Sequence, residues 1–104
     1  MTQTALTREQ VLAMEPGEEL DELISKHVFK MDMVAHVHYS TNVETAWMIL
    51  NELESEEWSM SVSKDDCHFY LQDQGLITKT TGVIQADSTP EAICKAALLA
   101  VLDL

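Results

Sequence analysis

The C-terminal segment of the chain is apolar on almost every side of the helix that it predicts. Ser88-Thr89-Pro90-Glu91 has the form of a capping box with a proline in the first turn, where no amide donor is needed. We expect the helix to be deeply buried in its own fold, or to be covered by a second copy in a homo-oligomer. The apolar residues that require this cover are Ile93, Cys94, Ala96, Ala97, Leu98, Leu99, Ala100, Val101 and Leu102.

Three segments in the N-terminal half also have helical spacing. The capping-box form Thr7-Arg8-Glu9-Gln10 predicts a short helix that ends at Glu15-Pro16-Gly17, because proline lacks an amide donor. A second helix is expected over residues 18–29, and a third from the capping box Thr41-Asn42-Val43-Glu44 to about residue 55, with a loop at residues 30–40 that could include a short strand. One face of the third helix is predicted to be buried, and it includes a tryptophan: Val43, Ala46, Trp47, Leu50 and Leu53.

After residue 57 the apolar pattern changes to a period of two. Residues 58–62 alternate apolar side chains with serines, which predicts a half-buried strand. Turn signals at residues 64–66 and 73–75 enclose a returning strand over residues 67–72. A third strand is expected between Ile77 and Ala86, with Gly82 as a bulge.

The net charge restricts the classes of partner. Eighteen acidic and six basic residues give a formal charge of −12, so direct binding to nucleic acid or to an anionic membrane is not expected. A strongly acidic field steers a protein towards basic surfaces, including the phosphate-binding grooves of nucleic-acid enzymes. The plain alternative, that the charge serves only solubility, stays open.

Length and composition predict a single domain over residues 1–104. The hydrophobic share of 46% and the charged share of 23% are typical of globular proteins. No apolar run approaches the roughly 18 residues that span a bilayer, and the N-terminus lacks the pattern of a signal peptide, so we expect an intracellular protein. Two cysteines are too few for a disulfide scaffold, and Cys94 is predicted to lie in the core.

Three motifs spread along the chain resemble one known family, the phage ABA sandwich domain of small phage and prophage proteins. The motifs are Met14-Glu15-Pro16-Gly17 with Glu19-Leu20-Asp21, then Tyr39-Ser40-Thr41 ahead of Ala46-Trp47, and finally residues 89–101. The resemblance implies an α/β/α sandwich of the α+β class, with a small antiparallel three-stranded sheet between helices. It implies phage origin and supplies no enzymatic activity that could be transferred to this chain, and its motifs have a structural character: two caps, a buried tryptophan and a core helix.

Four side chains are candidates for a zinc site. His36 and His38 are spaced i, i+2, so in an extended segment both imidazoles point to one face, and Cys67 and His68 could complete the set. No local spacing fixes this geometry, so surface histidines are the alternative. As a catalytic pair, Cys67 and His68 are excluded by the opposite directions of neighbouring strand residues.

The acidic residues that we predict to contact a partner form two runs. A solvated surface is more common for such runs than a catalytic carboxylate pair, which needs a buried pocket and a perturbed pKa. Together with the absence of a glycine-rich phosphate loop, this predicts a protein that is not an enzyme. The runs are Glu15, Glu18, Glu19, Asp21 and Glu22, and then Glu52, Glu54, Glu56 and Glu57.

The charge and the resemblance together predict a phage-encoded, non-enzymatic inhibitor of a host defence system in the host cytoplasm. In its most concrete form it is an anti-CRISPR-like protein whose acidic surfaces bind the basic nucleic-acid groove of a CRISPR effector nuclease. Two alternatives stay open: a protein that sequesters a nucleotide immune signal, and a structural or assembly accessory of the phage. Aromatic side chains that could stack a base are Trp47, Trp58, Phe69 and Tyr70, although such residues more often form a core, and Tyr70 and His68 are the better surface candidates.

Overall fold

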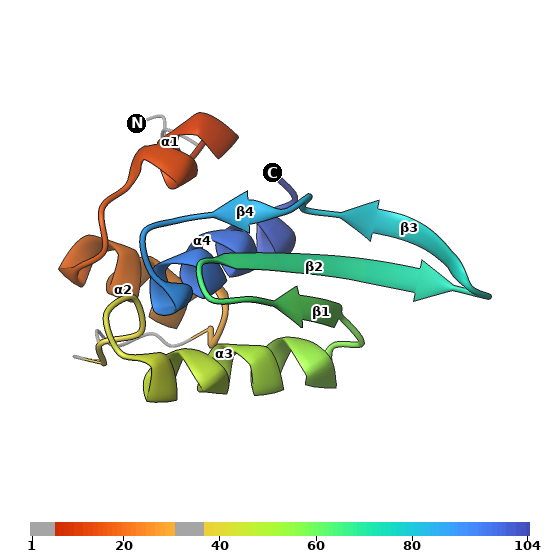
Figure 1. Cartoon of the computed structure of the whole chain (residues 1–104), viewed down its shortest axis with the longest axis horizontal. Helices are drawn as coiled ribbons and strands as arrows, with labels where there is room; N and C mark the ends of the chain where they lie inside the picture. Colours follow the sequence, from red (N-terminus) through yellow and green to blue (C-terminus); the bar gives the residue numbers. More distant parts are fainter. Residues whose placement is uncertain (1–5, 31–36) are drawn as a thin grey trace.

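A computed structural model describes residues 6–30 and 37–104 of the chain (Figure 1). The described ranges form an α+β fold with a small antiparallel sheet, which confirms the predicted class. Most of the predicted loop at residues 30–40 lies outside these ranges, and its described end, residues 37–40, contains no strand. The elements are α1 Arg8–Ala13, α2 Glu18–His27, α3 Val43–Ser55, β1 Ser59–Val62, β2 Asp66–Asp73, β3 Leu76–Thr80, β4 Ile84–Gln85 and α4 Thr89–Val101.

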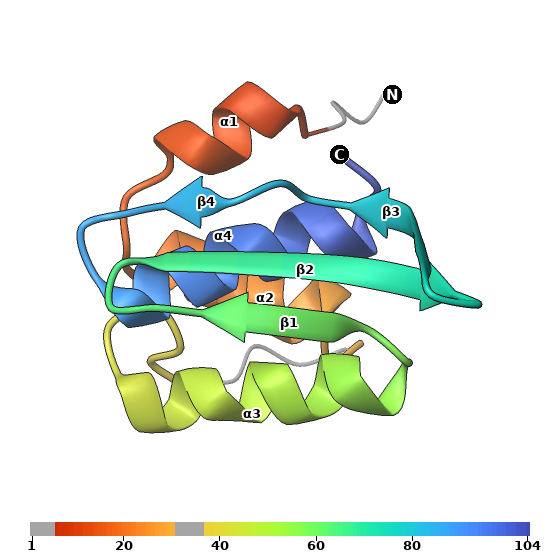
Figure 2. The same cartoon turned by 45° about the vertical axis from the view of Figure 1, so that its right-hand side comes forward.

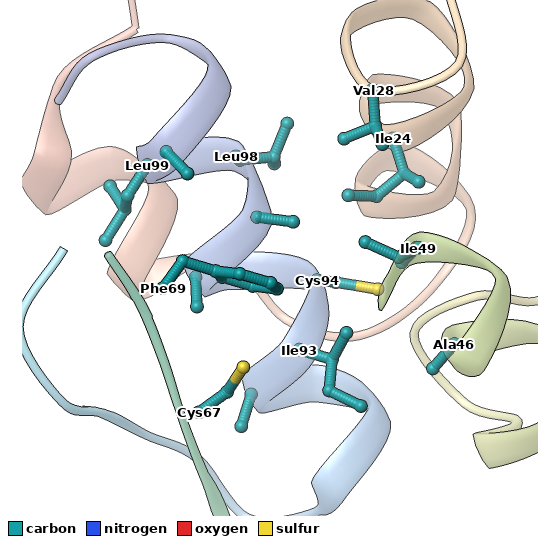
Figure 3. Close-up of a cluster of buried hydrophobic side chains, with 14 of the residues drawn as sticks. Ile24, Val28, Ala46, Ile49, Cys67, Phe69, Ile93, Cys94, Leu98 and Leu99 are labelled. Atoms are coloured by element: carbon teal, nitrogen blue, oxygen red, sulfur yellow. The ribbon is translucent and has the colours of Figure 1, made fainter. Parts of the chain in front are cut away.

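Helix α4 is the centre of the core. Every position from 90 to 100 is buried, and the predicted core position of Cys94 is confirmed. Figure 3 shows Cys67 and Phe69 of β2 on one side of α4, and Ile24 of α2 and Ile49 of α3 on the other. Because full burial of such a side chain contributes about 1.5–3 kcal/mol, this helix supplies much of the hydrophobic stabilisation. It is covered within one chain and needs no second copy for its burial.

Strand β2 is the central strand of the sheet and pairs antiparallel with β1, β3 and β4. The predicted third strand is present as two pieces, because the chain leaves the ladder at residues 81–83, around the expected irregularity at Gly82. There the amide of Phe69 donates to the side-chain hydroxyl of Thr81 at 3.2 Å, and the amide of Thr81 donates to the carbonyl of Phe69 at 3.0 Å. The Thr81 hydroxyl thus takes the place of a backbone carbonyl as the acceptor for the Phe69 amide. Gly82, with φ 75°, provides the left-handed backbone conformation of the turn that follows.

Helices flank both edges of the sheet and cover one of its faces (Figures 1 and 2). In Figures 1 and 2, α1 lies beyond β4 and α3 lies beyond β1, while α4 covers one face of the sheet. Arg8 fixes α1 to the edge of the sheet formed by β3 and β4, because its Nη2 donates to the carbonyl of Thr81 at 2.9 Å. This carbonyl is free to accept because the chain has left the ladder at that point.

The helix caps agree with the predictions in part. Thr7 and Gln10 form a complete capping box at α1. At α3 the cap is Asn42 rather than Thr41, because the Asn42 side chain accepts from two amides of the first turn. At α4 the Ser88 hydroxyl accepts from the amide of Glu91, whose carboxylate is engaged by a lysine and does not complete the box.

Candidate protein-docking surface

The first acidic run lies at the beginning of α2. Glu15, Glu18, Glu19 and Glu22 are exposed there. Negative charge near a helix N-terminus is favoured by about 0.3–1 kcal/mol through the helix dipole. The stability of α2 is therefore a sufficient reason for acidic residues at this place, and they also add to the acidic surface.

The fifth member of this run, Asp21, is buried, so its assignment as a partner-contacting residue is wrong. Its Oδ1 accepts from the backbone amide and from the hydroxyl of Ser40, at 2.7 Å in both cases. The same hydroxyl accepts from the amide of Gly17 at 2.8 Å. Asp21 thus fixes the segment before α3 to the start of α2, and this explains two of the family-like motifs as one hydrogen-bonded unit.

The second acidic run lies at the C-terminal end of α3. Glu54, Glu56 and Glu57 are exposed and Glu52 is half-buried. The helix dipole disfavours negative charge at this end. In the described part of the chain the run has one ion pair, with 3.9 Å between Lys30 Nζ and Glu56 Oε1, and both side chains are exposed. Helix stability therefore does not account for these four glutamates, unlike those of α2.

Three apolar side chains of α3 are exposed in its first two turns, together with Glu44. Val43, Trp47 and Met48 are 42%, 49% and 48% exposed. The expectation of a buried Trp47 is wrong, and so is the placement of Val43 on the core side. The buried residues of α3 have the spacing i, i+3, i+4, i+7 of a full helical stripe, and Trp47 is not one of them. This spacing is the signal in the sequence that could have shown that Trp47 lies outside the core. Its residues are Ala46, Ile49, Leu50 and Leu53.

The candidate zinc ligands do not form one site in the described residues. His36 lies outside the described ranges, and the exposed His38 has its Nδ1 4.0 Å from a carboxylate oxygen of Asp21. Cys67 is fully buried on the α4 side of β2, whereas His68 points to the opposite face, so the two cannot ligate one ion. Within residues 6–30 and 37–104, no group of three or more His, Cys, Asp or Glu side chains is placed to hold a metal.

The two cysteines are unsuited to nucleophilic chemistry. Burial, with a smaller contribution from the Asp66 carboxylate, raises the pKa of the Cys67 thiol to about 12. Burial also raises the pKa of the Cys94 thiol. Since the thiolate is the reactive form, both groups are inert at neutral pH.

The polar face of the sheet carries two ring side chains. His68 and Tyr70 project from β2 with ring centroids 5.0 Å apart and an interplanar angle of 43°, on the face opposite Phe69 as predicted. Ser59 and Ser61 of β1 are their partners in the ladder. This face offers stacking area, but a phosphate would also need a cation.

A shallow hollow of about 470 Å³ lies between the α1–α2 connection and the start of α4. Its lysine, Lys95, is buried and already engaged, because its Nζ donates to Glu91 Oε2 at 2.6 Å and to the carbonyl of Leu12 at 3.0 Å. Glu15 and Asp87 also line the hollow. Three carboxylates around one paired lysine disfavour a nucleotide phosphate.

Comparison with known families matches most of the chain to a phage domain. A family model described as the Phage ABA sandwich domain matches residues 8–98, which include all the elements described above except the last turn of α4. The comparison with curated proteins gives no match, and neither does the comparison with solved structures. None of the helices in the described ranges is long and apolar enough to cross a membrane.

Proposed function

Because the chain belongs to the Phage ABA sandwich domain family, we propose that it is a phage-encoded binding protein that inhibits a defence protein of the host without catalysing a reaction. Its partner carries a basic, nucleic-acid-binding surface, and the complex forms in the host cytoplasm. The most concrete partner is a CRISPR effector nuclease, because such enzymes hold their guide and target strands in a positively charged channel.

The observation that carries this proposal is the acidic end of α3. Four glutamates gather where the helix dipole disfavours them, and the described residues offer them one weak, exposed counter-charge, Lys30. Such a cluster raises the local negative potential, which accelerates encounter with a basic surface and competes with phosphates for it. With the charge of −12, this supports a protein partner rather than a nucleic acid.

The test uses the purified CRISPR effector nuclease of the phage's host. We expect the chain to bind it and to inhibit DNA cleavage, with affinity that falls as salt is raised. In a charge-reversed variant, Glu54→Lys with Glu57→Lys, Kd should rise by about tenfold or more, equivalent to about 1.4 kcal/mol. The matched control is Asp65→Lys with Asp73→Lys, which gives the same net charge through exposed residues at the ends of β2.

The control separates a site from a general charge effect. Equal losses of binding in the two double variants would mean that net charge alone steers the chain and that the end of α3 is no contact. If the wild-type chain neither binds the nuclease nor inhibits cleavage, the proposed partner is wrong. Detection of the chain in purified virions would then favour the structural or assembly role.

A nucleotide-sequestering role is the second reading, and it depends on a cationic site. The hollow beside Lys95 supports it poorly, since that lysine is buried in a pair with Glu91. A thermal-shift experiment with small nucleotides tests it directly, because a ligand at 100 times its Kd stabilises the folded state by about 2.7 kcal/mol.

A further inference from the structure

The inference concerns the outer face of α3, and it rests on the proposed function. We infer that this face is the docking surface of the chain, and that Trp47 is its anchor in an apolar pocket whose rim is basic. The proposed function assigns contact to carboxylates only. The geometry of α3 adds an apolar centre to that contact and names the helix that carries it.

Three apolar side chains are exposed in the first two turns of α3, and two of them lie side by side. Val43 and Trp47 are spaced i, i+4, so they are neighbours on the helix surface, whereas Met48 points about 100° further round the helix. Each is between 42% and 49% exposed. Trp and Met are enriched in the centres of protein interfaces, and Trp is among the residues that most often dominate binding energy. Among the described residues the core side of α3 is complete without Trp47, so core packing does not explain a tryptophan at this position.

One acidic side chain lies among these apolar side chains, and another lies beyond them on the same helix. Glu44 is exposed in the first turn, and Glu54 is exposed in the last turn on the same face as Trp47, two turns further along. The arrangement of an apolar centre within a charged rim is that of a protein interface. The partner that complements it has an apolar pocket surrounded by lysine or arginine.

The charge selects this partner over a second copy of the chain. Two copies that joined their α3 faces would bring two acidic rims together, each on a chain with a formal charge of −12. Like charges opposed across an interface cost several kcal/mol. A basic partner removes this repulsion and gains attraction from the same residues.

The helix is also held rigidly, which limits the entropic cost of docking. Asn42 caps its first turn, and the hydroxyl of Thr45 donates to the carbonyl of His38 at 2.8 Å. Its inner side packs against α4. A tryptophan has only two rotatable side-chain bonds, so little freedom is lost when it is immobilised on such a helix.

The experiment measures binding of the same purified nuclease to Trp47→Ala, with Leu76→Ala as the matched control. Leu76 is an even more exposed apolar residue, at 72%, but lies on β3. We expect Trp47→Ala to raise Kd by about 30-fold, mostly through faster dissociation, and Leu76→Ala to change it less than twofold. In a Trp58→Phe background, the fluorescence of Trp47 should shift to shorter wavelength when the complex forms.

The outcomes distinguish this inference from the proposed function. If charge reversal at Glu54 and Glu57 weakens binding while Trp47→Ala behaves like Leu76→Ala, the docking face is wrong and the proposed function stands. If the wild-type chain does not bind the nuclease, both are wrong. A concentration-dependent dimer of the free chain that Trp47→Ala abolishes would also overturn the inference, because the face would then belong to a second copy.

Discussion

At the scale of single residues, the same side-chain type has different roles in different surroundings. Asp21 belongs to an acidic run in the sequence, yet its carboxylate is buried and holds Ser40 through two hydrogen bonds of 2.7 Å. Its neighbours Glu19 and Glu22 are exposed. Helical periodicity places residue 21 beside the buried Leu20 and Ile24, but the sequence does not reveal which polar group it meets there, because Ser40 belongs to another segment.

Replacement of Asp21 should destabilise the fold more than replacement of its neighbour. Asp21→Ala leaves the buried amide of Ser40 without an acceptor, which costs about 1–3 kcal/mol. Glu22→Ala removes an exposed carboxylate, and a change of that kind is usually within about 0.5 kcal/mol. Urea unfolding of the two variants checks this. Equal free energies of unfolding would show that the bonds between Asp21 and Ser40 contribute nothing to stability.

The buried thiol of Cys67 predicts a loss of stability at alkaline pH. An unfolded thiol ionises near pH 9.0, whereas burial raises the pKa of Cys67 in the fold to about 12. Above pH 9 the unfolded state thus binds fewer protons than the folded state, so the free energy of unfolding falls as pH rises towards 12. Denaturant titrations at several pH values check this, with Cys67→Ala expected to have a shallower slope. Identical slopes in the two proteins would contradict the assignment.

At the scale of helices and strands, local patterns predict most of the fold. The change from helical spacing to a period of two marks the boundary between α3 and β1, and the apolar circumference of residues 89–101 marks the central helix. The split of the third strand is less predictable, because it depends on Thr81 bonding to Phe69 across the sheet. The exposure of Trp47 is predictable only if the buried face of α3 is assigned to the residues with spacing i, i+3, i+4, i+7 that begin at Ala46.

The two acidic runs should respond oppositely to charge reversal. Glu18→Lys with Glu19→Lys puts positive charge at the start of α2 and should lower the free energy of unfolding by about 1 kcal/mol, whereas Glu54→Lys with Glu57→Lys should leave it unchanged or raise it by up to about 1 kcal/mol. Thermal and urea unfolding at low salt check this. A larger loss in the α3 variant would mean that its glutamates stabilise the fold, which would remove the reason for assigning them to binding.

At the scale of the whole molecule, the apolar core surrounds α4, whereas most of the two acidic runs is exposed on α2 and α3. The core is formed by α4 with β2 on one side and α2 and α3 on the other, so the most apolar helix needs no partner (Figure 3). The exposed part of α3 includes apolar side chains in its first two turns and glutamates at its C-terminal end. The sequence predicts the fold class and the acidic character of the surface. It does not predict the docking face, because that requires knowing which residues the core leaves uncovered.

The most direct test of this account is the association rate constant with the purified effector nuclease, measured over a series of salt concentrations. We predict that the wild-type rate falls steeply as salt is raised, that Glu54→Lys with Glu57→Lys flattens this dependence, and that Asp65→Lys with Asp73→Lys largely preserves it. A rate that does not depend on salt, or that changes equally in both double variants, would contradict the claim that the acidic end of α3 meets a basic surface.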